Sequence, residues 1–229
     1  ATFSKQFKAF FGLAIAAKFI LLIVFSSGYQ EDLFIPFVVG FLEQGGNPWE
    51  YQSTIEDAFP YPPLMLYILF FALAPLQYFE SGSSAYILAK GLLYGLPLLI
   101  ADLVITAILI RMFIWHKTEI FIFYFTSPII LYSTYMHGQL DIIPTAILFS
   151  SIFLLSKKHY LFSAITLGLA ISPKFHTVAA LPIMAIFLLN KGRIKQSFTM
   201  MIVPIIIYLG FSAPYLEGGD SYGQQVLQN

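Results

Sequence analysis

Long apolar runs separated by short polar segments dominate this chain. The runs lie at 9–27, 63–79, 86–110, 119–136, 142–155, 159–172, 175–190 and 197–213. A helix that crosses a bilayer needs about 20 mostly apolar residues, or fewer where flanking polar side chains reach the interface. The pattern therefore predicts an all-α integral membrane protein with as many as eight crossing helices.

One segment, residues 29–86, departs from this pattern, and we call it the acidic segment. It is rich in turn-forming residues, as in Gly45-Gly46-Asn47-Pro48 and Pro60-Tyr61-Pro62-Pro63. It has no Lys or Arg, and its carboxylates are Glu31, Asp32, Glu43, Glu50, Glu56, Asp57 and Glu80. Because the rest of the chain is almost continuously apolar, we expect polar chemistry to occur in this segment.

The distribution of charge indicates which runs cross, because cytoplasmic loops are enriched in Lys and Arg. If run 63–79 does not cross, nine of the twelve basic residues share the cytoplasmic side: Lys5, Lys8, Arg111, Lys117, Lys157, Lys158, Lys191, Arg193 and Lys195. Ten of the twelve carboxylates are then external: Glu31, Asp32, Glu43, Glu50, Glu56, Asp57, Glu80, Asp141, Glu217 and Asp220. We therefore predict about seven transmembrane helices plus a juxtamembrane helix (63–79), broken by proline, in a long first external loop (28–85).

Composition agrees with a membrane protein and excludes several other classes. Hydrophobic residues make up 58% of the 229 residues and charged residues 10%, against about 45–50% and about 25% in soluble domains. The chain has no cysteine, and its net charge is zero with no basic stripe, so we expect no disulfide and no nucleic-acid partner. We interpret residues 1–229 as one domain, and expect it to be part of a longer polypeptide, truncated at the C-terminus.

Two polar groups at the predicted external face are candidates for chemistry. Asp32, beside Glu31, follows the first run, and a carboxylate there can accept a proton from a hydroxyl group; the alternative is a solvated helix end. His137-Gly138-Gln139-Leu140-Asp141 forms a short loop. A plain turn needs only Gly138 and Asp141, so His137 and Gln139 favour a functional role.

Further candidates are basic or aromatic. Lys174 is the one basic residue in a predicted external loop, with His176 nearby, and its natural partner is an anion such as phosphate; the alternative is a contact with lipid headgroups. Lys18, Lys90 and Asp102 lie within predicted spans, where charged residues are functional hypotheses by default. For Asp102 we favour an interhelical hydrogen bond or ion pair, with Lys18 as one possible partner.

Tyr61 is a candidate for stacking on a sugar ring, although aromatic residues are common at the membrane interface for structural reasons. We predict no cofactor. A divalent cation held by His137, His176, Asp32 and Asp141 stays open, since nothing in their spacing demands it.

Taken in order, these motifs resemble the GT-C superfamily of integral membrane glycosyltransferases, nearest its polyprenol-phosphate-mannose-dependent mannosyltransferases. The resemblance covers nearly the whole chain. It rests on these stretches: Gln30-Glu31-Asp32; Gly45-Gly46-Asn47-Pro48-Trp49; Tyr61-Pro62-Pro63-Leu64; Leu99-Ile100-Ala101-Asp102-Leu103; Ser127-Pro128-Ile129; His137-Gly138-Gln139-Leu140-Asp141; and Gly168-Leu169-Ala170-Ile171-Ser172-Pro173-Lys174.

The resemblance implies a catalytic first external loop with juxtamembrane helices. It implies that Asp32, with Glu31 as the alternative, is the base on the acceptor hydroxyl. Gln139 and Asp141 match a second polar position, and Lys174 matches the position that holds the lipid-linked phosphate. The implied reaction moves a hexose from a polyprenyl-phosphate donor by single displacement, and mannose is the favoured sugar. The acceptor is a glycan, lipid or protein on the external (periplasmic) face of the inner membrane.

Two other functions remain open at this stage. A transporter or lipid-carrier flippase would also carry charged residues within its spans and proline-broken helices, although such proteins usually show paired repeats. A non-catalytic membrane subunit of a larger complex would retain the same motifs without turnover.

Overall fold

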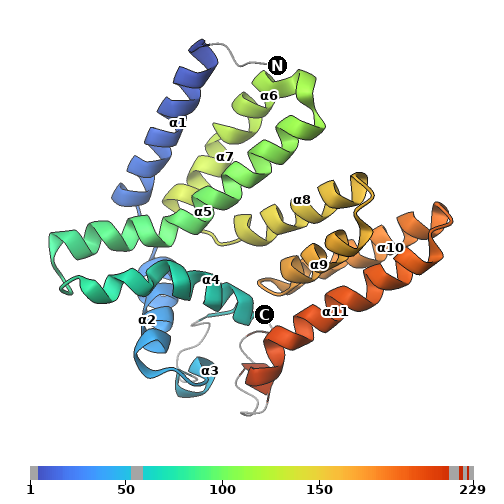
Figure 1. The fold of residues 1–229 in the computed structure, drawn as a ribbon. Coiled ribbons are helices and arrows are strands. Elements are labelled where there is room, and N and C mark those ends of the chain that lie inside the picture. Colours follow the sequence, from blue (N-terminus) through green and yellow to red (C-terminus); the bar gives the residue numbers. More distant parts are fainter. Residues whose placement is uncertain (1–4, 53–58, 217–221, 224–225, 227–229) are drawn as a thin grey trace.

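The computed structural model describes residues 5–52, 59–216, 222–223 and 226, and the described chain is all-helical (Figure 1). Its α-helices are α1 (Lys5–Val24), α2 (Ile35–Gln44), α3 (Pro48–Tyr51), α4 (Pro63–Leu73), α5 (Ser84–Met112), α6 (Lys117–Ile120), α7 (Pro128–Ile130), α8 (Ile142–Ser156), α9 (Tyr160–Ile171), α10 (Ala180–Asn190) and α11 (Ile194–Leu216). Wider π-helical turns form η1 (Tyr29–Phe34), η4 (Phe121–Phe125) and η5 (Leu131–Met136), and tighter 3₁₀ turns form η2 (Ala74–Tyr78), η3 (Ile114–His116) and η6 (Phe175–Ala179).

The helices coincide with the apolar runs, but the expected number of crossings is wrong. Among the described residues, three helices are long and apolar enough to span a membrane, within Phe7–Val24, Ser84–Met112 and Ile194–Leu216. The prediction of seven fails because several runs form shorter helices. At 1.5 Å per residue, the 15 residues of α8 extend about 22 Å and the 12 residues of α9 about 18 Å, less than the hydrocarbon thickness.

Run 119–136 is interrupted within its length. The π-helical turns η4 and η5 and the short α7 replace a continuous helix there, with a break at Thr126–Ser127 before Pro128. Proline lacks an N–H group and disfavours a helical conformation in the preceding residue, which accounts for the break. Hydropathy averages over such a break, so the sequence pattern alone overestimates the uninterrupted helix.

The predicted juxtamembrane helix (63–79) forms as α4 followed by η2, with Pro75 where α4 gives way to η2. Four of its side chains, Met65, Leu66, Leu69 and Leu73, are fully buried, because α4 packs between α2 and α5. One side of this helix is therefore part of the hydrophobic core.

The acidic segment is more helical than its turn residues indicate. Residues 29–44 form η1 and α2, and their apolar side chains join a core that includes Phe37, Trp49 and Phe59. Trp49 donates a hydrogen bond from its indole nitrogen to the carbonyl oxygen of Phe59 at 3.3 Å and packs edge-on against Tyr215 at 4.8 Å between ring centres. The segment is thus packed against the C-terminal helix α11.

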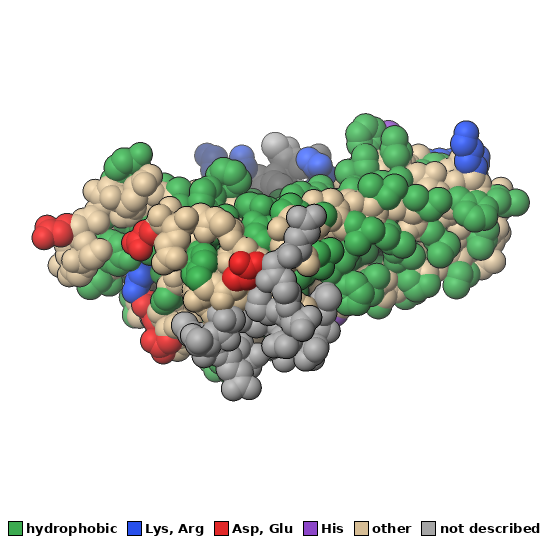
Figure 2. Space-filling view, turned by 90° about the horizontal axis from the view of Figure 1, so that it is seen from below, with side chains coloured by type: hydrophobic (Ala, Val, Ile, Leu, Met, Phe, Trp, Pro, Cys, Tyr) green, Lys and Arg blue, Asp and Glu red, His purple; other side chains and the backbone are tan. Residues whose placement is uncertain are grey.

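Charged groups separate to opposite ends of the molecule. In Figure 1 the start of α1, the end of α5 and α6 lie at the top, and the turns after α8 and α10 lie toward the upper right; these parts carry the predicted cytoplasmic Lys and Arg residues. The acidic segment, with α2 and α3, lies at the bottom. Figure 2 shows that end, with carboxylates gathered over its left part and a mainly hydrophobic surface on the right. Of the carboxylates assigned outside, Glu56, Asp57, Glu217 and Asp220 lie outside the described residues.

Candidate functional site

A cavity of about 480 Å³ opens at the acidic end of the molecule. It brings together five of the residues predicted from the sequence, from three separate stretches of chain. The residues that line it are Tyr29, Phe34, Pro60, Tyr61, His137, Gly138, Gln139, Asp141 and Lys174. The walls thus combine aromatic rings with a cation, a carboxylate, an imidazole and an amide, which are the groups that orient a polar ligand.

Lys174 and Asp141 form an ion pair in this cavity, and the Lys174 ammonium lies 5.4 Å from the centre of the Tyr61 ring. Lys174 lies in extended backbone just before η6, and Asp141 immediately precedes α8. Their side chains remain 33% and 40% exposed. Because an ion pair this open to water contributes little stability, an incoming anion can displace Asp141 from Lys174 or bind Lys174 alongside it. An ammonium has three N–H donors, enough for Asp141 and a second oxygen ligand.

Tyr61 provides a neutral hydroxyl in the cavity. Burial raises the pKa of Tyr61 well above its ordinary value, and the nearby negative charge of Asp141 raises it further. Its hydroxyl therefore stays protonated near neutral pH and acts as a donor or acceptor of a hydrogen bond, not as a base.

The turn that carries His137 and Gln139 adopts a backbone conformation that depends on Gly138. Gly138 has φ +69°, and a Cβ there would lie 2.6 Å from Oε1 of the buried Gln30. The hydroxyl of Tyr94 donates a hydrogen bond to the Gly138 carbonyl at 2.8 Å. The His137 ring is stacked on Tyr132 at 6.1 Å and meets Tyr29 edge-on at 6.0 Å. The turn and the His137 ring are thus held from several sides.

We expect Gly138→Ala to destabilise this turn, because alanine is strained at positive φ and its Cβ would displace the end of the buried Gln30 side chain. Strain and overpacking together predict a destabilisation of about 2–4 kcal/mol. Thermal unfolding in detergent measures it. Gly192→Ala is the matched control, since Gly192 has the same φ of +69° but open space around it, and that variant should lose only the strain part.

Asp32 and Glu31 lie beside the cavity, in different surroundings. Glu31 forms an ion pair with Lys90 of α5. Asp32 is exposed and lines a shallower neighbouring depression with Ser27, Gly28, Tyr29, Leu33 and His137. Tyr29 and His137 border both spaces. Among the described residues, Asp32 has no ion-pair partner, so of the two predicted candidates it is the carboxylate that is available to a ligand.

His176 lies in η6, two residues beyond Lys174, and its side chain is exposed. It is not among the residues that line the cavity. Its role as a binding residue remains a prediction. Within the described part of the chain, no group of three or more His, Asp or Glu residues is arranged to hold a metal ion.

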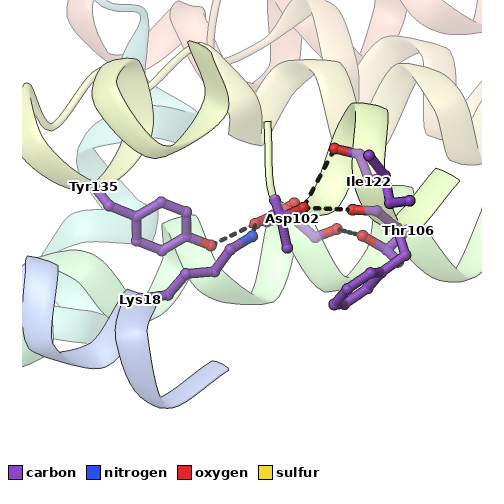
Figure 3. Close-up of polar contacts among 7 residues, drawn as sticks. Lys18, Asp102, Thr106, Ile122 and Tyr135 are labelled. Atoms are coloured by element: carbon purple, nitrogen blue, oxygen red, sulfur yellow. Dashed lines mark hydrogen bonds and ion pairs between the residues drawn. The ribbon is translucent and has the colours of Figure 1, made fainter. Parts of the chain in front are cut away.

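A buried polar cluster lies in the helices behind the cavity (Figure 3). Lys18 of α1 forms an ion pair with Asp102 of α5, which confirms the interhelical contact expected for Asp102. The hydroxyl of Tyr135 donates to the same carboxylate oxygen at 2.5 Å, and the Lys18 ammonium lies 3.4 Å from the centre of the Phe125 ring. Both charged side chains are fully buried. Since Tyr135 is two residues before His137, this cluster also anchors the turn of the site.

Several residues that shape the site were missed by sequence reasoning. Tyr29 and Phe34 line the cavity, and Gln30 and Tyr94 support the turn from behind. For the packing of α5 against α1 behind the site, the sequence did offer a signal. Gly91 and Gly95 are four residues apart, and small residues at that spacing mark the close approach of membrane helices. The contacts of Gln30 and Tyr94 with Gly138 carry no such local signal.

Comparisons of the chain with protein-family models, with curated proteins and with solved structures found no match.

Proposed function

We propose that this chain is a hexosyltransferase that transfers a sugar from a polyprenyl-phosphate carrier to a hydroxyl acceptor at the external face of the membrane. Mannose is the sugar that the proposal favours. The observation that carries the proposal is the cavity in which an exchangeable Lys174–Asp141 pair meets Tyr61, His137 and Gln139. Its volume of about 480 Å³ falls in the range of small-molecule sites. We place the protein in the inner cell membrane, with its basic end on the cytoplasmic side and its acidic end on the external side.

The proposed reaction is a single displacement at the anomeric carbon. Asp32 accepts the proton of the acceptor hydroxyl as the acceptor oxygen forms its bond to that carbon. The bond from the anomeric carbon to the phosphate oxygen breaks, and the electron pair leaves with polyprenyl phosphate. Lys174 neutralises the charge that grows on this phosphate, which is where a fixed cation lowers the barrier most. Tyr61, Gln139 and His137 orient the sugar between the two groups.

An apolar groove in the structure supports the proposal that the donor is lipid-linked. It has a volume of about 510 Å³ and lies against α4, α5 and α8, with Ile68, Phe71, Ile100 and Ile143 among its walls. Phe71 and Ile100 are exposed apolar side chains, so a hydrocarbon chain placed here would remain in contact with the membrane interior. Tyr61 of the cavity is two residues before α4, and Asp141 of the cavity precedes α8, so both spaces involve the same elements.

We expect Lys174→Gln to lower kcat/KM for the donor about 10- to 100-fold, because a hydrogen bond to a charged group contributes about 1.5–3 kcal/mol. The measurement is transfer of radiolabelled mannose from polyprenyl-phosphate-mannose in membranes that contain the protein. Lys195→Gln, which removes the same charge at the basic end, should leave transfer unchanged.

The same assay decides between the proposed function and its rivals. If wild-type membranes transfer no sugar from any polyprenyl-phosphate donor tested, the enzyme proposal fails, and a transporter or a non-catalytic subunit becomes the better explanation. If transfer occurs but Lys174→Gln matches the wild type, Lys174 does not hold the phosphate.

A further inference from the structure

A second pocket lies at the opposite, basic end of the molecule, between α1 and α5. It measures about 460 Å³ and is lined by Phe7, Lys8, Phe11, Leu103, Thr106, Ala107, Ile110 and Arg111. We propose that this pocket binds one anionic phospholipid, with the phosphate between Lys8 and Arg111 and an acyl chain along the apolar wall. This site is separate from the cavity of the proposed transfer reaction.

The pocket exists because α1 and α5 approach each other most closely near one end and diverge toward the other. Near the external end, a Cβ on Gly91 would lie 2.6 Å from the carbonyl oxygen of Leu22, and a Cβ on Gly95 would collide with the Leu22 side chain. The absence of side chains at these glycines therefore lets the two backbones meet. Toward the N-terminus of α1 the helices diverge (Figure 1). The Lys18–Asp102 pair bridges the middle, and the pocket occupies the open end beyond it.

The polar recognition groups are two cations at the rim. Lys8 and Arg111 are both exposed, and within the described residues neither has an ion-pair partner. No carboxylate lines the pocket. Asp102 lies one helical turn deeper than Thr106, but its charge is matched by Lys18. Basic pockets between membrane helices on the cytoplasmic side are suited to acidic lipid headgroups, and the Arg guanidinium can contact phosphate with two N–H groups at once.

Below the rim the wall is apolar. Leu103, Ala107 and Ile110 form one side, and Phe11 forms another, held by stacking on Phe125 at 4.8 Å between ring centres. The one hydroxyl group in the wall, Thr106, donates its hydrogen to the Asp102 carbonyl at 2.9 Å. From Leu103 to Arg111 the helix rises about 12 Å, room for a headgroup and the first part of an acyl chain. A free phosphate would leave this apolar surface uncovered, and a neutral lipid would leave the two cations without a partner.

The test is native mass spectrometry of the full chain in detergent, titrated with phosphatidylglycerol, with phosphatidylcholine of the same acyl chains, and with glycerol phosphate. The wild type should retain one phosphatidylglycerol in preference to phosphatidylcholine, and glycerol phosphate should not bind measurably. The double variant Lys8→Gln/Arg111→Gln should bind phosphatidylglycerol about 30-fold more weakly, since each cation near an acidic lipid contributes about 1 kcal/mol. Equal retention of the two lipids, or tight binding of glycerol phosphate, would overturn the proposal.

The matched control is Lys191→Gln/Arg193→Gln, which removes the same charge from the turn after α10, whose residues do not line this pocket. Its affinity for phosphatidylglycerol should equal that of the wild type. If both double variants lose affinity alike, attraction to the overall charge explains the binding and the site does not exist.

A second variant tests the acyl-chain part without changing charge. Ala107 is exposed toward the pocket, so Ala107→Phe should fill it and weaken phosphatidylglycerol binding about tenfold, the effect of losing contact with roughly two methylene groups. Leu88→Phe, at another exposed apolar position near the other end of α5, is the control. Unchanged binding in Ala107→Phe would show that the chain does not enter the pocket.

Discussion

Replacing Asp32 by Asn is expected to lower the rate of sugar transfer about 10²- to 10⁴-fold, the usual contribution of a general base. The amide has nearly the same shape as the carboxylate but cannot accept the proton of the acceptor hydroxyl. The effect should fall on kcat, with the KM for the donor nearly unchanged, because Asp32 lies in the depression beside the cavity and does not line the phosphate-binding side. The measurement is the transfer assay at saturating donor.

Glu31→Gln is the matched control, because Glu31 is the adjacent carboxylate but is paired with Lys90. It should retain most of the activity and lose only the stabilisation of a partly exposed ion pair, about 1 kcal/mol or less. If Glu31→Gln abolishes transfer and Asp32→Asn does not, the two roles are reversed. Equal transfer by wild type and Asp32→Asn would remove Asp32 from the mechanism.

Replacing Asp102 by Leu is expected to destabilise the protein by about 3–5 kcal/mol. The change leaves the Lys18 ammonium fully buried with no opposite charge, and it also removes the acceptor of the Tyr135 hydroxyl. Thermal unfolding in detergent, followed by the fluorescence of the fully buried Trp49, reports the loss. Because Tyr135 is close to His137 in the chain, transfer activity should fall as well.

The double variant Lys18→Met/Asp102→Leu separates charge from packing. With both charges absent, no buried ion is left unpaired, so most of the lost stability should return. A double variant as unstable as Asp102→Leu alone would mean that the defect comes from packing around α5, and that the ion pair contributes little. The stacking of Phe125 on Phe11 provides an apolar surround for the new Met side chain.

Much of the helical layout was predictable from local pattern. The runs at 86–110 and 142–155, for example, became α5 and α8 with ends within two residues. Helix formation depends on neighbouring residues, and a sustained apolar stretch without glycine-rich or polar interruption favours a helix wherever it is buried or in lipid. The number of crossings was not predictable in the same way, because a window of hydropathy does not register the interruption at Thr126–Ser127 or the 3₁₀ turn η6 that replaces the start of the helix in run 175–190.

The candidate site was predictable as a set of residue types but not as an arrangement. His137, Gln139, Asp141, Lys174 and Tyr61 were expected, and they share one cavity. That Asp141 is the partner of Lys174, and that Glu31 is occupied by Lys90 while Asp32 is exposed, depends on contacts between residues 33 and 59 positions apart. Such contacts are made only when helices pack.

The sequence by itself therefore determined the apolar, helical character of the chain, the separation of acidic and basic ends, and the positions of most of its long helices, because each follows from residue type and local order. Only the tertiary structure decided which helices reach a spanning length, which charges neutralise one another, and where α1 and α5 leave an open pocket. These depend on distances between elements, which side-chain size and backbone approach at residues such as Gly91 and Gly138 set in three dimensions.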